Sequence, residues 1–289
     1  MSLGCAEGDE KWESLDLTFT PELTPELVAA GPGRIHKHEK FASRFLAKKR
    51  DIIVFTPGIY EKRPDLRFPV LYLEDGQNLF DPATSFIPGM YWRVGETTDA
   101  LIAHGAIQPL IIVGIYNTDK RVNEYTPTRD KKLGGGRADK YGRMLVEELK
   151  PFIESSYRTL HQPENIGLGG SSLGGLLTIY LGLKYPNIFG KLAVLSPSVW
   201  WSQRAILGYV AQTPVQTHAR IWLDVGTSEA SNTLKNVTDL HDALVQRGWQ
   251  DNQNLHFEVV QGAQHNEDAW ARRVGPFLRF LFPAGEPSK

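Results

Sequence analysis

The chain has 289 residues, a length that fits one large domain or two small ones. Its apolar content of 41% and charged content of 22% are those of an ordinary globular protein, and a chain of this length buries enough surface to fold without covalent cross-links. The formal net charge of −1 gives no long-range field that would recruit nucleic acid or an anionic membrane, so small or locally recognised partners are expected.

Cysteine content and hydropathy exclude further classes of protein and of metal site. Cys5 is the only cysteine, which rules out intramolecular disulfides and zinc sites built on several thiolates. No apolar run reaches the roughly eighteen residues of a transmembrane helix, so no membrane span is expected. The first residues are polar and acidic and lack the apolar core of a signal peptide. The compartment stays open between the cytoplasm and a secreted or periplasmic location reached with a signal since removed, and so does the oligomeric state.

The N-terminal part of the chain differs from the rest. Pro21, Pro25 and Pro32 are expected to break any helix there, and residues 34–45 alternate loosely, as an edge strand does. Antiparallel strands therefore lead into the main sheet. We expect an N-terminal extension over residues 1–33 and a single α/β domain over residues 34–283.

From about residue 50 onward, short strand-like runs alternate with amphipathic helical stretches. The predicted strands cover 51–56, 69–74, 110–116, 166–169, 192–196, 220–224 and 256–260. The predicted helices cover 94–104, 139–157, 173–185, 233–247 and 268–281. Several strands are continuously apolar, as strands buried on both faces of a parallel sheet are. The alternation predicts a mostly parallel central sheet with helices on both faces. Residues 116–137, rich in charges and glycines, are predicted to form a long surface loop of the functional kind.

One motif carries chemistry. Residues 170–174 read G-S-S-L-G, which fits G-x-S-x-G with Ser172 at its centre, and the motif lies between a predicted strand and a predicted helix. A sharp strand-to-helix turn of this kind exposes a serine oxygen above the sheet and needs glycine at the flanking positions. An ordinary glycine-rich turn is the plain alternative. A dinucleotide-binding loop is rejected because Ser172 stands where its third glycine would be.

A serine nucleophile needs a base, and in this chain order an acid should precede that base. His265 follows the predicted strand 256–260 in a loop, at the edge of the sheet where catalytic groups gather. His256 lies inside that strand and His241 on a helix, so His265 is the preferred base. The acid is expected from the segment after strand 220–224. Glu229 is preferred there over Asp224.

The developing oxyanion needs two N–H donors. The residue after the nucleophile, Leu173, supplies the first. The second is expected at the end of the early strand 69–74, where Gln77 or Asn78 would be the donor. A plain turn built on Asp75 and the glycine that follows it explains the same residues locally.

These residues also carry a family likeness, in segments spread over residues 34–283. The segments read V-L-Y-L-E-D-G-Q-N-L-F (70–80), G-G-S-S-L-G-G (169–175), Y-P-N-I-F-G (185–190), S-P-S-V-W-W (196–201), L-D-V-G-T-S-E (223–229) and G-A-Q-H-N-E-D-A-W (262–270). They resemble the putative-esterase family of α/β hydrolases. That family includes feruloyl and acetyl-xylan esterases, S-formylglutathione hydrolase, mycolyltransferases and siderophore trilactone esterases. The 196–201 segment looks most like the siderophore branch.

The resemblance implies an α/β-hydrolase fold and assigns site positions. Ser172, Glu229 and His265 take the triad positions, and Gln77 and Leu173 take the oxyanion hole.

The sequence indicates the residues that contact the substrate less specifically than it indicates the catalytic residues. Trp200 and Trp201 are expected to stack on an aromatic acyl group. Arg121, Glu124 and Tyr125 fall on an R-x-x-E-Y pattern that either lines the pocket or forms a structural Arg–Glu pair.

The expected activity is that of a serine esterase working through an acyl-enzyme on a small-molecule or carbohydrate-linked ester, with an aromatic acyl group as one candidate. The alternatives are a catecholate siderophore trilactone esterase, an acyltransferase to a sugar hydroxyl, and a hydrolase-like binding module without chemistry. No metal or cofactor is expected. His36 and His38 alternate on one strand face, but they lack a third ligand of suitable spacing.

Overall fold

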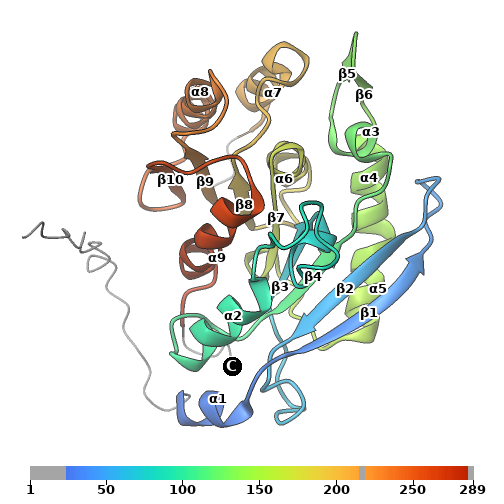
Figure 1. The fold of residues 1–289 in the computed structure, drawn as a ribbon, viewed down its shortest axis with the longest axis vertical. Coiled ribbons are helices and arrows are strands. Elements are labelled where there is room, and N and C mark those ends of the chain that lie inside the picture. The colour runs from blue at the N-terminus through green and yellow to red at the C-terminus, as the bar shows by residue number, and fades with distance from the viewer. Residues whose placement is uncertain (1–23, 215–218, 286–289) are drawn as a thin grey trace, which may run out of the picture.

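An eight-stranded sheet runs through the computed structural model, which describes residues 24–214 and 219–285 (Figure 1). The strand order is β1-β2-β4-β3-β7-β8-β9-β10. The strands are β1 (Arg34–Phe41), β2 (Arg50–Thr56), β3 (Val70–Glu74), β4 (Ile111–Ile115), β7 (Ile166–Ser171), β8 (Lys191–Leu195), β9 (Arg220–Gly226) and β10 (Leu255–Val260). The pairs β1–β2 and β2–β4 are antiparallel, and every later pair is parallel. The predicted mostly parallel sheet with antiparallel N-terminal strands is confirmed.

Helices cover both faces of the sheet. They are α1 (Thr24–Ala30), α2 (Val94–Ala103), α3 (Arg121–Tyr125), α4 (Ala138–Met144), α5 (Lys150–Ser156), α6 (Leu173–Lys184), α7 (Trp201–Gln212), α8 (Thr233–Gln246) and α9 (Glu267–Leu281). The π-helical turn η2 (Leu145–Leu149) joins α4 to α5, and the 3-10 turns η1 (Gly76–Asn78) and η3 (Pro163–Asn165) precede longer elements. On one face α6 packs on β7 and β8 and contacts α3, α4 and α7. On the other face α9 packs on β8 and β9 and contacts α2, as Figure 1 shows.

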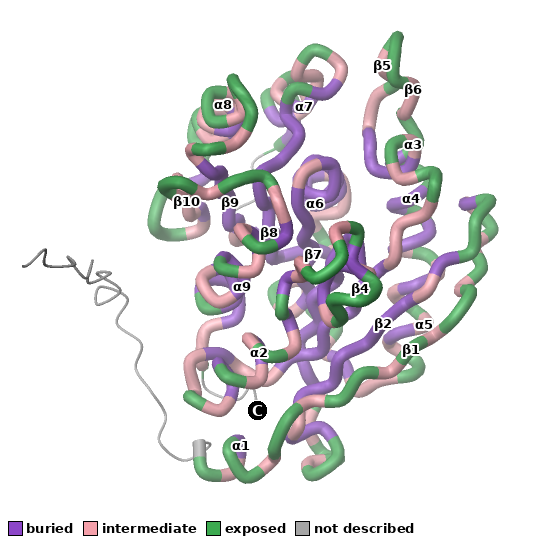
Figure 2. Tube along the Cα trace, in the orientation of Figure 1, coloured by how far each residue is buried: buried purple, intermediate pink, exposed green. Residues whose placement is uncertain are grey.

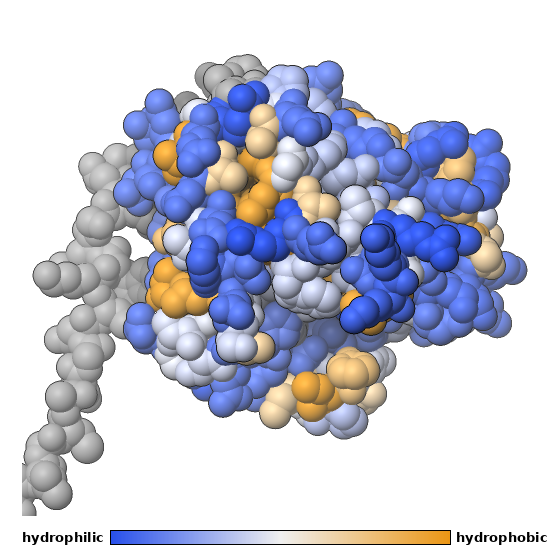
Figure 3. Space-filling view, turned by 90° about the horizontal axis from the view of Figure 1, so that it is seen from above, coloured by the Kyte–Doolittle hydropathy of each residue, from blue (hydrophilic) through white to orange (hydrophobic). Residues whose placement is uncertain are grey.

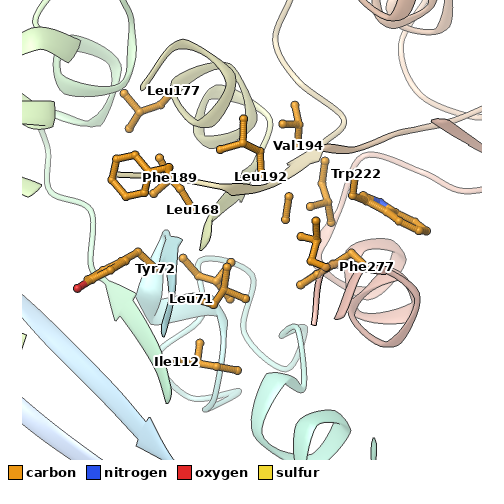
Figure 4. Close-up of a cluster of buried hydrophobic side chains, with 14 of the residues drawn as sticks. Leu71, Tyr72, Ile112, Leu168, Leu177, Phe189, Leu192, Val194, Trp222 and Phe277 are labelled. Atoms are coloured by element: carbon orange, nitrogen blue, oxygen red, sulfur yellow. The ribbon is translucent and has the colours of Figure 1, made fainter. Parts of the chain in front are cut away.

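The core is built from the central strands and these two layers. All residues of β3, β4 and β8 are buried, because their side chains are covered on both faces (Figure 2). Figure 4 shows Leu168 and Leu192 of the sheet between Leu177 of α6 and Phe277 of α9. Burying each such side chain contributes about 1.5–3 kcal/mol. The continuously apolar strands of the sequence therefore form the centre of the molecule.

The order of the strands fixes where a site can form. From β3 the chain goes to β4 on one side and later to β7 on the other side. The connections leave the sheet in opposite directions at this point, and in sheets of this kind functional sites form at the carboxyl ends of the strands beside it. Asp75 follows β3 and Ser172 follows β7, so both residues lie at the carboxyl ends of these neighbouring strands.

The structure differs from the sequence expectations in three segments. The expectation that Pro25 excludes a helix is wrong: α1 has Pro25 in its first turn, where the missing N–H costs no helical hydrogen bond. Residues 116–137 are not an open surface loop. They form α3 and a hairpin of β5 (Arg129–Asp130) and β6 (Gly134–Gly135), and Tyr125 within them is fully buried. Helix α7 was not predicted either. Over the described residues, no helix is long and apolar enough to cross a membrane.

Candidate active site

Ser172 occupies a strained turn between β7 and α6. Its φ of 59° and ψ of −120° are rare for a residue with a side chain, and such conformations persist only where the surroundings enforce them. The turn also brings β7 and α6 close together: a Cβ at Gly170 would lie 3.0 Å from the Glu74 Cβ and 3.0 Å from the Gly174 carbonyl carbon. Any larger residue at position 170 would therefore crowd both neighbours, and glycine allows the tight turn that raises the serine oxygen above the edge of the sheet.

His265 bridges Ser172 and Glu229. Its Nε2 lies 2.9 Å from the Ser172 Oγ, and its Nδ1 lies 2.7 Å from the Glu229 Oε2. A carboxylate can only accept, so Nδ1 carries the proton and Nε2 is left to accept from the serine hydroxyl. The ring also packs edge-on against Trp270, with 4.9 Å between ring centroids. This tautomer and this orientation are the ones that a general base needs.

The Glu229 carboxylate is enclosed, with its side chain only 1% exposed. Besides His265, it accepts hydrogen bonds from the Gly226 N–H at 2.7 Å and the Ser196 hydroxyl at 2.6 Å. Burial alone would raise its pKa, but the hydrogen bonds from His265, Ser196 and Gly226 outweigh burial and hold the pKa of Glu229 below its usual value. Glu229 is therefore a carboxylate at neutral pH.

Asp224, the other acid that the sequence left open, has different partners. It accepts hydrogen bonds from the Arg273 Nη1 at 2.6 Å and the Trp222 Nε1 at 2.8 Å, and it is fully buried. The same Arg273 Nη1 reaches the Ser196 Oγ at 2.8 Å. Asp224 and Arg273 thus form a buried ion pair beneath Ser196 and Glu229, and His265 faces Glu229 instead.

The two predicted oxyanion donors lie at the ends of β7 and β3. Leu173 is the first residue of α6, and N–H groups in a first helical turn have no acceptor within the helix. In η1, the Asn78 N–H donates to the Asp75 carbonyl, whereas the backbone hydrogen bonds of the described residues leave the Gln77 N–H unused. Of the two candidates, Gln77 is the one with a free donor.

A second serine, absent from the sequence interpretation, lies beside Ser172. The Ser198 Oγ is 3.3 Å from the Ser172 Oγ, and the Ser198 N–H donates to the Ser172 carbonyl oxygen at 2.9 Å. Its only sequence signal was the S-P-S string after β8. No local pattern of the sequence indicated Arg273, because its partner Asp224 lies in another element, β9.

The aromatic residues predicted to contact the substrate differ in their exposure to solvent. Trp200 is 49% exposed. Trp201 is 2% exposed, and its indole N–H donates to the Thr128 carbonyl at 2.8 Å. Tyr125 is fully buried. The prediction of Trp201 and Tyr125 as substrate contacts is therefore corrected: both are packed inside the protein, where they support the segment after β4.

Arg121 does not pair with Glu124 as its sequence neighbourhood suggested. Both edge nitrogens of its guanidinium bind Asp75, at 2.8 Å from Nε to Oδ1 and 2.7 Å from Nη2 to Oδ2. Glu124 instead accepts from the Arg50 Nη2 at 3.1 Å, in a pair that is almost fully buried. A structural Arg–Glu pair exists, but its arginine comes from β2.

Four further histidines, each considered above, have ordinary partners. His36 contacts the Thr56 hydroxyl at 3.1 Å, and His38 contacts the Tyr157 hydroxyl at 2.7 Å. His256 stacks on Trp222, and His241 lies between Asp242 and Asp251. In the part of the chain that the structure describes, no group of three or more His, Cys, Asp or Glu residues is arranged to hold a metal ion.

Comparison with known proteins gives consistent matches. The profile of the family described as Putative esterase matches residues 43–281. Uncharacterized protein YbbA of Bacillus subtilis is 26% identical over 253 residues, covering 83% of this chain and 95% of its own. The endo-1,4-beta-xylanase/feruloyl esterase of Xylanibacter ruminicola is 32% identical over 248 residues, covering 84% of this chain but 30% of its own. The iron(III) salmochelin esterase of Escherichia coli is 29% identical over 259 residues, covering 83% of this chain and 57% of its own.

Solved structures share the fold. A ferulic acid esterase superposes with a TM-score of 0.69 at 20% identity, covering 87% of this chain and 99% of its own. At this identity the likeness establishes the architecture, an α/β-hydrolase fold.

Proposed function

Since the chain belongs to the Putative esterase family and is an ester-hydrolysing enzyme, we propose that it cleaves carboxylic esters through an acyl-enzyme formed on Ser172. The observation that carries this proposal is the unbroken hydrogen-bonded line from the Ser172 Oγ through His265 to Glu229. Serine, acid and histidine also follow one another in the chain order of this fold.

The mechanism follows from the geometry. The Ser172 Oγ attacks the ester carbonyl carbon while the His265 Nε2 takes its proton, and Glu229 stabilises the imidazolium. The N–H groups of Leu173 and Gln77 bind the oxyanion of the tetrahedral intermediate. The intermediate collapses with cleavage of the ester C–O bond, and the alcohol leaves with the proton from His265. Water, deprotonated by His265, then attacks the acyl-enzyme and releases the acid and free Ser172.

No step of this mechanism requires a metal or an organic cofactor, because the positive partners of the developing charge are N–H groups and the imidazolium. The acid, the base and the nucleophile come from three loops of one chain. The reaction therefore needs only an ester and water.

An aromatic acyl group is the substrate feature best supported by the surface. Phe86 is 80% exposed and Trp200 is 49% exposed. Phe86 N–H is held by the Asn78 Oδ1 at 2.9 Å, next to Gln77, and Trp200 follows Ser198, whose hydroxyl contacts Ser172. These aromatic rings thus come from the segments on either side of the nucleophile strand. Figure 3, which views the end that bears α7, α8 and the β5–β6 hairpin, shows apolar residues scattered among mainly hydrophilic ones.

The catecholate siderophore trilactone is the second candidate substrate, because it too presents aromatic acyl groups on ester bonds and because a salmochelin esterase is among the relatives. Transfer of the acyl group to a sugar hydroxyl is the alternative fate of the acyl-enzyme. A binding module without chemistry is the alternative if Ser172 is inert.

The first experiment tests the chemistry at Ser172. Wild type, Ser172→Ala and His265→Ala are incubated with a fluorophosphonate probe and with p-nitrophenyl acetate, beside the surface controls Ser155→Ala and His161→Ala. We expect wild type and controls to label and turn over, and both site variants to lose on the order of 10³-fold or more in kcat/KM. A folded wild type that neither labels nor hydrolyses would leave the binding module as the better description.

The second experiment tests the substrate. Hydrolysis of methyl ferulate, a catecholate trilactone and ethyl acetate is compared, with and without an added sugar acceptor. A preference for either aromatic ester over ethyl acetate supports the aromatic acyl site, and a new sugar ester among the products shows acyl transfer. Equal, slow hydrolysis of all three esters contradicts an aromatic acyl site.

A further inference from the structure

The segment that follows β4 holds the turn that follows β3. The Asp75 carboxylate accepts two hydrogen bonds from the Arg121 guanidinium, at 2.8 and 2.7 Å, and one from the Asn117 side-chain amide at 2.6 Å. The Asp75 N–H donates to the Tyr125 hydroxyl at 3.2 Å. Asp75 is 6% exposed, so these contacts are sheltered from water. One residue of the turn is therefore fixed at both its backbone and its side chain by one neighbouring segment.

Asp75 needs this support because of its backbone conformation. Its φ of 57° and ψ of 46° lie in the left-handed region, which a residue with a Cβ adopts only rarely and mainly where local hydrogen bonds hold it. Asp75 stands two positions before Gln77, and its conformation starts the 3-10 turn η1 that presents the Gln77 N–H. The Gln77 side chain is tied to the same segment, since its Oε1 accepts from the Asn117 N–H at 3.2 Å.

The supporting segment is itself anchored in the core. Arg121 and Tyr125 stand at opposite ends of α3, and the Arg121 guanidinium lies over the Tyr125 ring, 5.0 Å from its centroid. Within α3, Glu124 is bound by Arg50 of β2 in a pair that is almost fully buried. Hydrogen bonds thus tie α3 to β2 through Glu124 and to Asp75 through Arg121 and Tyr125.

We propose that Arg121 is a positioning residue for the oxyanion hole: through Asp75 it fixes the turn that aims the Gln77 N–H at the tetrahedral intermediate. The inference rests on the proposed function, because it needs an oxyanion bound at Gln77. The bidentate edge of the guanidinium, Nε and Nη2, is used on Asp75. Arg121 therefore acts on the reaction through the protein and not by holding an anionic part of the substrate.

This role predicts a particular kinetic signature. Loss of a whole oxyanion donor costs about 10²–10³ in kcat. Loosening the turn displaces the Gln77 N–H but does not remove it, so Arg121→Met should lower kcat by roughly 10- to 100-fold. KM for a small neutral ester should change by less than about threefold, because the ground-state carbonyl makes weaker use of the donor than the oxyanion does.

The decisive experiment is a double-mutant cycle with p-nitrophenyl acetate, using Arg121→Met, Asp75→Asn and the double variant. If Arg121 acts through Asp75, the double variant is no slower than the slower single variant by more than about twofold, because residues in one network are not additive. If Arg121 contacts the substrate directly, the two losses multiply, and that result overturns the inference. Addition of guanidinium ion to Arg121→Ala should restore part of kcat.

A second readout separates positioning from loss of the fold. A boronic acid forms a tetrahedral adduct on Ser172 that resembles the intermediate, and its affinity should fall by the same factor as kcat in Arg121→Met. Lys120→Met removes the neighbouring exposed cation, which pairs with Asp119, and serves as the matched control with unchanged kcat. Unchanged kcat and boronic acid affinity in a folded Arg121→Met would also overturn the inference. Labelling of wild-type Ser172 by fluorophosphonate tests the proposed function independently of these outcomes.

Discussion

The Glu229 carboxylate shows how single residues decide the chemistry of this site. Although it is buried, the hydrogen bonds from His265, Ser196 and Gly226 keep it ionised. The Arg273 Nη2 lies 3.6 Å from its Oε1. Trp270 contacts two of the partners of Glu229. Its ring packs against His265, and its indole N–H donates to the Ser196 hydroxyl at 3.1 Å. The position of the imidazole therefore depends on residues that never reach the substrate.

Replacing Glu229 with Gln tests this arrangement. The amide cannot accept from the Nδ1–H while keeping its other partners, so the wrong tautomer is favoured and kcat should fall on the order of 10²- to 10⁴-fold. Because the pKa of Glu229 is held below its usual value, wild-type kcat/KM between pH 5 and pH 9 should show no titration of this group. Glu258→Gln, at the exposed pair with His256, is the control. Activity within tenfold of wild type in Glu229→Gln would exclude Glu229 as the acid.

Glu74, directly beneath the serine turn, gives a prediction on stability. It is fully buried, the Tyr141 hydroxyl donates to it, and burial raises its pKa from 4.5 to about 8. Between these values the folded state binds a proton that the unfolded state has lost, so the stability from this group is present below pH 4.5 and is lost as pH rises towards 8.

Glu74→Gln keeps the side chain neutral at every pH. The fall in unfolding free energy between pH 5 and pH 8 should therefore shrink by a few kcal/mol, taking about 1.4 kcal/mol for each pKa unit. Urea denaturation at both pH values measures it. Parallel pH profiles for wild type and variant would show that Glu74 is ionised in the folded protein.

At the level of elements, the contact between α6 and the sheet sets the geometry of the serine turn. A Cβ at Gly175 would lie 2.8 Å from the Leu195 carbonyl oxygen. Gly175→Ala should therefore push α6 away from β8, lower the unfolding free energy by about 1–3 kcal/mol and reduce kcat by displacing Ser172. Gly208→Ala on α7, where a Cβ meets nothing within 4 Å, should be neutral or stabilising by up to about 1 kcal/mol. Equal changes in unfolding free energy and kcat in the two variants would contradict this account of the helix–sheet contact.

The elements also show what sequence alone predicts. The main-sheet strands β2, β3, β4, β7, β8, β9 and β10 and the helices α2, α6, α8 and α9 followed from hydrophobic periodicity, because each pattern is local. Helix α3 did not, since its five residues span little more than one turn and its stability comes from the distant partners Arg50 and Asp75.

The same limit applies to the site. The serine turn carries a local motif, so Ser172 was readable from the sequence. The sequence favoured Glu229 over Asp224 without excluding Asp224, because the choice depends on whether His265 or Arg273 stands opposite each carboxylate.

For the whole molecule, the C-terminal helix is joined to an element of the N-terminal half of the chain. The C-terminal helix α9 packs against the early helix α2, and the Gln108 N–H donates to the Phe282 carbonyl at 3.1 Å. Residues 34–283 are predicted to form one domain, so we expect a single unfolding transition in which far-UV circular dichroism and tryptophan fluorescence coincide. Separate midpoints for the two signals would show that parts of residues 34–283 unfold independently.

The edge strand β1 has a consequence for handling the protein. It carries Lys37 and Glu39 on an exposed face, and its pairing with β2 shifts register between His38 and Phe41, where Lys40 has a φ of 58°. Because of these charges and this bulge, β1 does not present the flat row of free amide and carbonyl groups with which a second molecule would pair in fibril growth. We therefore expect concentrated samples to resist edge-to-edge aggregation at this side of the sheet, and replacements that straighten or neutralise β1 to remove that protection.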